Sequence, residues 1–300
     1  MTDKVSLRNK YERYVTFDEP IPYWGKNATL EDKQNNNCLL FYPVMIKDAS
    51  EFYNYSTCLL TDHTSELDKS LPFEDAMKVL SMSCYEYLYY ESVKENPKNL
   101  YILSFCALLS ICLRNEKFKN IVFYKDKFNE FSSIFNQRDS LGKPAFMINQ
   151  VLYDWEDFDN IKELIAYQNQ LELPEIEKDK RFRDAREKAK KLRDRILSEG
   201  NSNKMGNLEE QLICLSLGYG LPYNEVCKVS LRKFNKMISY MNKKIHYEIY
   251  MSLLGQVEFK DKSVLKHWMT TEDEDKWKDV IMDTDEIDAK INGSDRPQPK

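Results

Sequence analysis

The stretch "LPYNEVCKVSLRKFNKMISYMNKKIHYEIYMSLLG" (residues 221–255) predicts a short helix, a break and a long amphipathic helix. Pro222 suits the start of the short helix, Ser230 can cap the long one, and Gly255 is its expected end. Apolar residues recur along the long helix at spacings of three, four, three and four, the pattern of a packing seam. Such a helix, studded with lysines, suits either a helix-turn-helix reader of DNA or a face that grips another protein.

The composition favours a helical fold. A chain of 300 residues, 42% hydrophobic and 31% charged, fits a globular protein with one large domain or two smaller ones. Only 8 glycines and 10 prolines argue for long regular elements rather than a turn-rich β sandwich. We therefore expect a mainly α, α-rich α+β protein, with some β structure in its N-terminal part and a helical C-terminal domain.

Shifts in composition divide the chain into four expected parts. They are an N-terminal α+β domain (1–140), a helical connector (141–200) that includes a charged helix (175–199), a C-terminal helical domain (201–270) and an acidic, partly disordered tail (271–300). The tail holds ten acids and five bases, which accounts for the whole net charge of −5. The rest of the chain is therefore electrically balanced.

Local patterns predict the elements of the first two parts. In chain order, they are a strand at 13–17, a strand at 38–46, a short helix at 48–60 capped by Asp48, one long helix at 70–96, a strand or buried helix at 100–113, a strand at 120–124, and a helix that ends the segment 144–173.

The charged helix at 175–199 carries a second apolar seam. Its apolar residues again follow a three–four spacing, and favourable i,i+4 charge pairs flank them. One interpretation is a connecting helix packed on its own chain; the other is a short coiled coil with a second copy or a partner. In the second case the oligomerisation residues are Phe182, Leu192 and Ile196.

No catalytic or cofactor motif occurs in the chain. Phosphate-binding loops, dinucleotide-binding glycine patterns, HExxH and GxSxG are all absent from the sequence. None of His63, His246 and His267 has a partner at metal-ligand spacing. The acidic cluster at 154–159 lacks the glycine and glutamate of a calcium loop, so we interpret it as the first turn of a helix. We expect no enzyme activity, no cofactor and no metal, although an enzyme of unrecognised type stays an alternative.

The cysteines and the apolar runs suggest a cytoplasmic protein. Seven cysteines, an odd number, occur without any CxxC pair and mostly among apolar residues, as expected of reduced core residues. The N-terminus lacks an apolar signal core. The most apolar run, 100–113, is shorter than the roughly 20 residues that span a bilayer. We expect no membrane contact.

The lysines of the opening stretch raise a DNA-binding alternative. The helix–turn–helix order at 208–245 superficially resembles the two-helix unit of sigma-factor-like DNA readers, and a docked helix would place basic residues on phosphates. By residue type, the contacts would come from Arg232, Lys233, Asn235 and Lys236. The remainder of the chain has no basic excess, so we expect nucleic acid not to be the partner.

A protein-docking face is the interpretation we prefer for the long helix. Its apolar residues extend beyond the seam, and a helix that is apolar on more than one side needs more than one neighbour. Methionine and tyrosine side chains offer an adaptable surface for a client. The expected partner-binding residues are Met237, Tyr240, Met241, Tyr247 and Met251.

The order of features between about 150 and 285 resembles the tail assembly chaperones of tailed bacteriophages. The resemblance rests on "LYDWEDFDNIKELIAYQNQLELP", the charged helix, "NKMGNLEEQLICLSLGYGLPYNEVCKVSLRKFNKMISYM" and "EFKDKSVLKHWM" followed by the acidic "DKWKDV". It implies a non-enzymatic helical protein that binds the tape-measure or tail-tube protein before assembly. The setting would then be the cytoplasm of the bacterial host.

Overall fold

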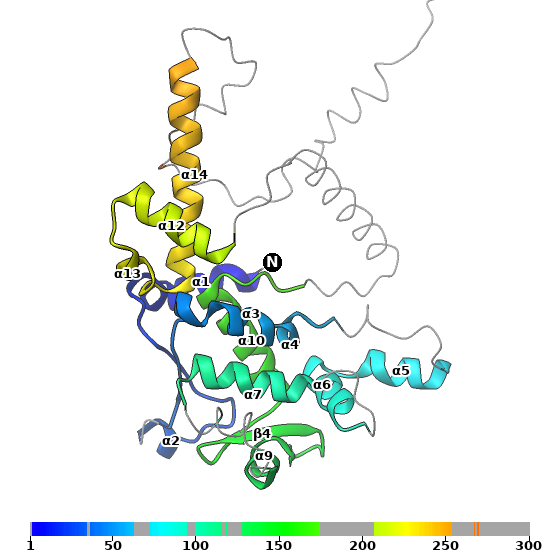
Figure 1. Cartoon of the computed structure of the whole chain (residues 1–300). Coiled ribbons are helices and arrows are strands. Elements are labelled where there is room, and N and C mark those ends of the chain that lie inside the picture. Colours follow the sequence, from blue (N-terminus) through cyan, green and yellow to red (C-terminus); the bar gives the residue numbers. More distant parts are fainter. Residues whose placement is uncertain are drawn as a thin grey trace, which may run out of the picture. The chain divides into compact units, whose positions relative to one another are not determined.

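The computed structural model describes residues 2–34, 37–62, 72–94, 100–115, 118, 128–174, 207–253, 267 and 269. The fold is mainly α-helical with a small β component, which confirms the predicted class (Figure 1). The helices are α1 (Thr2–Phe17), α2 (Leu30–Gln34), the 3-10 helix η1 (Ile46–Asp48), α3 (Ala49–Tyr55), α4 (Thr57–Leu60), α5 (Phe73–Ser81), α6 (Cys84–Ser92), α7 (Tyr101–Cys112), α9 (Phe128–Phe135), α10 (Trp155–Asn169), α12 (Leu208–Tyr219), α13 (Tyr223–Val226) and α14 (Leu231–Leu253). The strands are β1 (Ile21–Tyr23), β2 (Leu39–Phe41), β3 (Gln137–Arg138), β4 (Pro144–Ile148) and β5 (Val151–Tyr153).

The chain divides into two compact units, Met1–Ser239 and Tyr240–Lys300, with the division inside α14. The four-part division expected from the composition stays a prediction. Helix α10, placed by the sequence in the connector, packs against α1 and α6 of the expected N-terminal domain. Its buried Ile161 and Ile165 give the two segments one shared core. The charged helix and the acidic tail lie outside the described residues, as does the expected strand at 120–124.

An aromatic cluster forms the centre of the first unit. Phe146 of β4 stacks on Tyr153 with ring centroids 5.4 Å apart and meets Tyr85 of α6 at 5.3 Å. It also contacts Phe105 of α7 at 5.6 Å and Phe135 of α9 at 6.3 Å. In Figure 1, α7 accordingly runs between the α3–α4 pair and β4. The cluster joins elements from residues 84 to 153 into one core.

A tight hairpin that the sequence did not reveal brings Phe146 and Tyr153 together. Strands β4 and β5 are antiparallel, with Ile148 opposite Val151. The two turn residues, Asn149 and Gln150, have φ values of 52° and 66°, as in a type I′ turn. Glycine is the usual second residue of this turn, so Asn-Gln is a weak signal in a sequence.

The expected strand at 13–17 is wrong, because these residues end helix α1. Tyr11 and Val15 lie one helical turn apart and are both buried, on a helix that packs against α10. The β-branched and aromatic residues that suggested a strand are thus a buried helix face. The strand expected at 38–46 is confirmed over β2, which pairs with β1 in an antiparallel register.

The single helix expected at 70–96 is instead two helices, α5 and α6. Met82 is extended, and Ser83 begins α6 through a capping box with Glu86. Residues 100–113, left open between strand and helix, form the buried helix α7. Asp48 stands at the start of α3 but makes no side-chain cap bond. Among the described residues, no helix combines the length and the apolar character needed to cross a membrane.

Local capping signals bound the helices of the C-terminal part. Asn207 and Glu210 form a capping box that opens α12, and Gly220 ends it in the left-handed conformation with φ 65°. Pro222 precedes α13. The acidic cluster at 154–159 opens α10 as expected, with Asp154 as its N-cap.

Candidate functional site

The first turn of α14 is tied to the body of the first unit by backbone pairing. Segment 44–46 runs antiparallel to segment 229–231. The amide of Ile46 donates to the carbonyl of Val229 at 3.1 Å, and the amide of Leu231 donates to the carbonyl of Val44 at 2.8 Å. These bonds fix the position of the turn between α13 and α14.

Contacts with the residue after α1 and with α10 reinforce this junction. Asp18, a left-handed residue directly after α1, accepts a hydrogen bond from the Ser230 hydroxyl at 2.9 Å and pairs with the Lys233 ammonium at 2.5 Å. The Arg232 guanidinium donates to the Tyr167 carbonyl at 2.6 Å and lies 5.0 Å from the centre of the Tyr167 ring. The junction joins α1, α10 and α14.

These contacts change the interpretation of the predicted nucleic-acid residues. Arg232 and Lys233 are both committed to partners inside the first unit, so their charges serve the attachment of α14. Asn235 is half-buried and Lys236 is exposed. The junction therefore does not include the other two predicted residues, Asn235 and Lys236.

Helix α12 contacts the first half of α14. Its residues Leu212 and Leu215 are buried, as is Phe234 of α14. The Tyr219 hydroxyl donates to the Met237 carbonyl at 3.0 Å. Figure 1 shows α12 crossing α14 in this region. The end of α12 is therefore one neighbour of the first half of α14.

The predicted partner-binding residues are unevenly exposed. Met237, Tyr240, Met241 and Tyr247 are half-buried, and Met251 is exposed. By helical spacing they share one face, and two of their rings contact other side chains. The Tyr247 ring packs on the His267 ring, with centroids 5.1 Å apart, and the Lys243 ammonium lies over the Tyr240 ring. Phe182, Leu192 and Ile196, the predicted oligomerisation residues, lie outside the described residues.

The exposure of the seam residues increases along α14. Leu231 and Phe234, in its first turn, are 1% and 2% exposed. Ile245 and Ile249, which continue the seam in the second unit, are 45% and 49% exposed. Isoleucine pairs at i,i+4 lie side by side on a helix surface. We call Met241, Ile245 and Ile249 the open seam. The sequence pattern predicts the seam but does not show which of its residues are buried.

Residue types that bind metals do not form a cluster in the described ranges, and three thiols of the first unit are buried. No group of three or more histidine, cysteine or acidic side chains in the described ranges is arranged to hold a metal ion. Burial raises the pKa of the Cys106 thiol to about 12 and also raises the pKa of Cys58 and Cys112. These three thiols are therefore protonated at neutral pH, as expected of core cysteines.

Comparisons with known proteins identify no relative. No protein-family model matches the chain, and neither a search of curated proteins nor a search of solved structures found a match.

Proposed function

We propose that this protein is a non-enzymatic assembly or interaction protein that binds a helical or unfolded segment of a client protein on the second half of α14. The open seam carries the proposal, because Ile245 and Ile249 continue an apolar row whose first members are buried. Amphipathic client segments bind through such apolar rows at helical spacing. The sequence resemblance extends the proposal to a client of the phage tail, the tape-measure or tail-tube protein, and to the host cytoplasm.

Replacing both Ile245 and Ile249 by glutamate should weaken client binding at least roughly tenfold, because it sets charges against an apolar partner. Both positions are about half exposed, so the melting temperature should change little. The measurement is co-purification and titration with tape-measure and tail-tube proteins encoded by neighbouring genes.

Ser239→Glu is the matched control, because Ser239 is exposed and lies on a different face of the same helix. This control should bind the client as the wild type does. Undiminished binding by the double variant, or neighbouring genes unrelated to tails, would contradict the corresponding part of the proposal.

We also expect no sequence-selective binding of duplex DNA at about 150 mM salt, where specific DNA readers typically bind at nanomolar concentrations or below. The reason is that Arg232 and Lys233 are held by Tyr167 and Asp18. Fluorescence anisotropy with random and selected duplexes measures this. Submicromolar, selective binding that Lys236→Glu abolishes and Lys78→Glu leaves intact would instead favour a DNA-binding regulator.

A further inference from the structure

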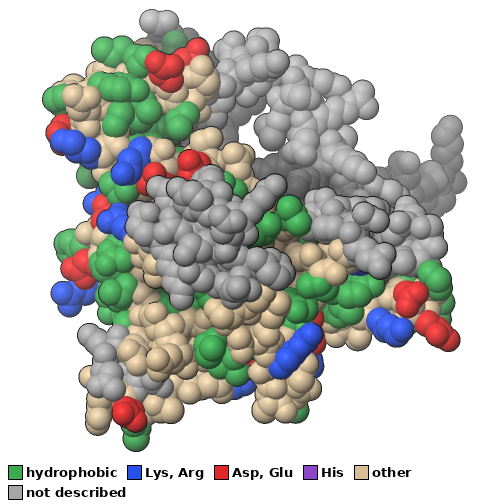
Figure 2. Space-filling view, turned by 60° about the horizontal axis from the view of Figure 1, so that its bottom comes forward, with side chains coloured by type: hydrophobic (Ala, Val, Ile, Leu, Met, Phe, Trp, Pro, Cys, Tyr) green, Lys and Arg blue, Asp and Glu red, His purple; other side chains and the backbone are tan. Residues whose placement is uncertain are grey.

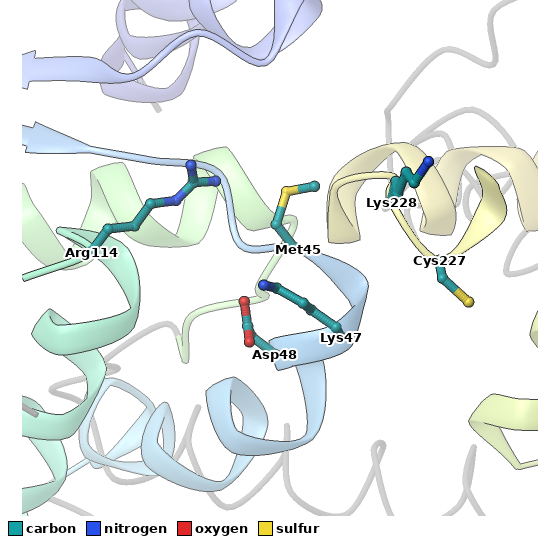
Figure 3. A pocket seen from close by; sticks show the side chains of 6 residues that line it. All are labelled: Met45, Lys47, Asp48, Arg114, Cys227 and Lys228. Carbon is teal, nitrogen blue, oxygen red and sulfur yellow. The ribbon is translucent and has the colours of Figure 1, made fainter. Parts of the chain in front are cut away.

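A surface hollow of about 410 Å³ lies in the first unit. Its lining comes from η1 with the residue before it, from the end of α7, and from the turn after α13. Figure 3 shows Arg114 and Lys47 extending into it from opposite sides, with Asp48 beside Lys47. The lining residues are Met45, Lys47, Asp48, Arg114, Cys227 and Lys228.

Backbone hydrogen bonds connect the three walls of the hollow to one another. The amide of Tyr42 donates to the carbonyl of Cys112 at 2.7 Å, which joins the segment before η1 to the end of α7. The Ile46–Val229 bond joins η1 to the turn after α13. The three cations of the lining thus project from a preformed frame, although more than sixty residues separate each from the next along the chain.

The electrostatics of the hollow favour an anion. Lys47, Arg114 and Lys228 oppose a single acid, Asp48. The described residues provide no hydrogen bond or ion pair to the Lys47 ammonium, whereas Lys228 pairs with Glu225 at 2.7 Å. Two of the three cations are thus without an acidic partner in the described part of the chain.

Arg114 combines an unusual backbone conformation with an ordered side chain. It is left-handed, with φ 50°, at the end of α7, where glycine is the usual residue. Its guanidinium lies 4.7 Å from the centre of the Tyr42 ring, a cation–π contact that holds the group in one orientation. A guanidinium held in this way loses less freedom when it binds a phosphate with two parallel hydrogen bonds.

We propose that this hollow binds a small phosphate monoester whose organic part carries hydroxyl groups. The phosphate, with a charge of about −2, would lie between Arg114 and Lys47, the two lining cations without an acidic partner in the described part of the chain. Asp48 would accept a hydrogen bond from a ligand hydroxyl, and Met45 would contact the organic part. A volume of about 410 Å³ exceeds the needs of a bare phosphate and falls in the range of small-molecule sites.

Isothermal titration calorimetry of the full chain with AMP, adenosine and inorganic phosphate tests the proposal. We expect AMP to bind and adenosine not to bind, since the phosphate supplies the charge. Arg114→Gln and Lys47→Gln should each weaken AMP binding about tenfold, the loss of one charge-assisted contact. Lys78→Gln, the same change on α5, should leave binding unchanged.

Asp48→Asn should change phosphate affinity in the opposite direction to Arg114→Gln and Lys47→Gln. Removing the carboxylate should strengthen the binding of inorganic phosphate, because a repulsive charge is lost. The preference for AMP over inorganic phosphate should fall, because the neutral amide of this variant accepts a ligand hydroxyl less strongly than a carboxylate does. Absence of AMP binding at millimolar concentration, equal binding of adenosine, or wild-type affinity in both Arg114→Gln and Lys47→Gln would overturn the proposal.

Discussion

Phe146→Ala should lower the free energy of unfolding by about 3–5 kcal/mol, the usual range for a fully buried phenylalanine. Phe146 is 0% exposed and contacts rings from α6, α7, α9 and β5. Rings on so many sides cannot all move inward, so the substitution should leave a cavity. Since domains are stable by only about 5–15 kcal/mol, much of the protein should unfold at mild urea concentrations.

Phe73→Ala is the matched control for this experiment. The same atoms are removed, but Phe73 is 79% exposed at the start of α5. Figure 2 shows hydrophobic and charged side chains next to one another at this end of the molecule, on the right of the view. Phe73→Ala should change the free energy of unfolding by no more than about 0.5 kcal/mol. Urea unfolding followed by circular dichroism measures both, and equal losses would mean that Phe146 is not central to the core.

Elements with local signals could be predicted from the sequence. Asn207 and Glu210 at the start of α12, and Gly220 at its end, act within one turn of the helix they bound. The i,i+3/i+4 seam of α14 is equally local. The capping box of Ser83 and Glu86 is a signal of the same kind, and it could have located the break between α5 and α6.

Features that depend on distant partners could not be predicted. Tyr11 and Val15 have residue types that favour strands, and only the packing of α1 on α10 makes them a helix face. The roles of Arg232 and Lys233 are decided by Tyr167 and Asp18, which lie 65 and 215 residues away. A basic cluster therefore looked like a candidate DNA surface although half of its predicted contacts anchor a helix.

The first turn of α14 and the open seam differ in exposure. Its first turn is fixed by backbone pairing with segment 44–46 and by the Asp18 contacts. Beyond the division at Ser239–Tyr240, the seam residues are half exposed. This contrast suits the client binding that we propose, because the exposed apolar row would contact the client segment.

Asp157→Ala should lower the free energy of unfolding by at least about 3 kcal/mol, because each buried donor left without an acceptor costs about 1–3 kcal/mol. Asp157 is 0% exposed in the first turn of α10. One of its carboxylate oxygens accepts from the Tyr23 hydroxyl and the Lys26 amide, both at 2.8 Å, and the other accepts from the Asp154 amide at 3.1 Å. The substitution leaves three donors from two segments unsatisfied.

Asp157→Asn separates hydrogen bonding from packing, because asparagine keeps the shape but has only one acceptor oxygen. Its amide must face either the Asp154 amide or the Tyr23 and Lys26 donors, so we expect a loss smaller than that of alanine. Asp75→Ala is the control. Asp75 also lies in the first turn of a helix, but its side chain is 50% exposed and pairs with Lys78, so its effect should stay below about 1 kcal/mol.

The loss caused by Asp157→Asn should also depend on pH. Burial, the largest influence, raises the pKa of Asp157 above its usual value. The folded state therefore binds the proton more readily than the unfolded state. That stabilisation is complete below the unfolded pKa of about 3.9 and is lost as the pH rises through the folded pKa. Asparagine cannot titrate, so the difference in unfolding free energy between wild type and variant should shrink across this window. Urea unfolding of both proteins at several pH values measures the difference, and a gap that widens with rising pH would show that the hydrogen bonds to the carboxylate outweigh its burial.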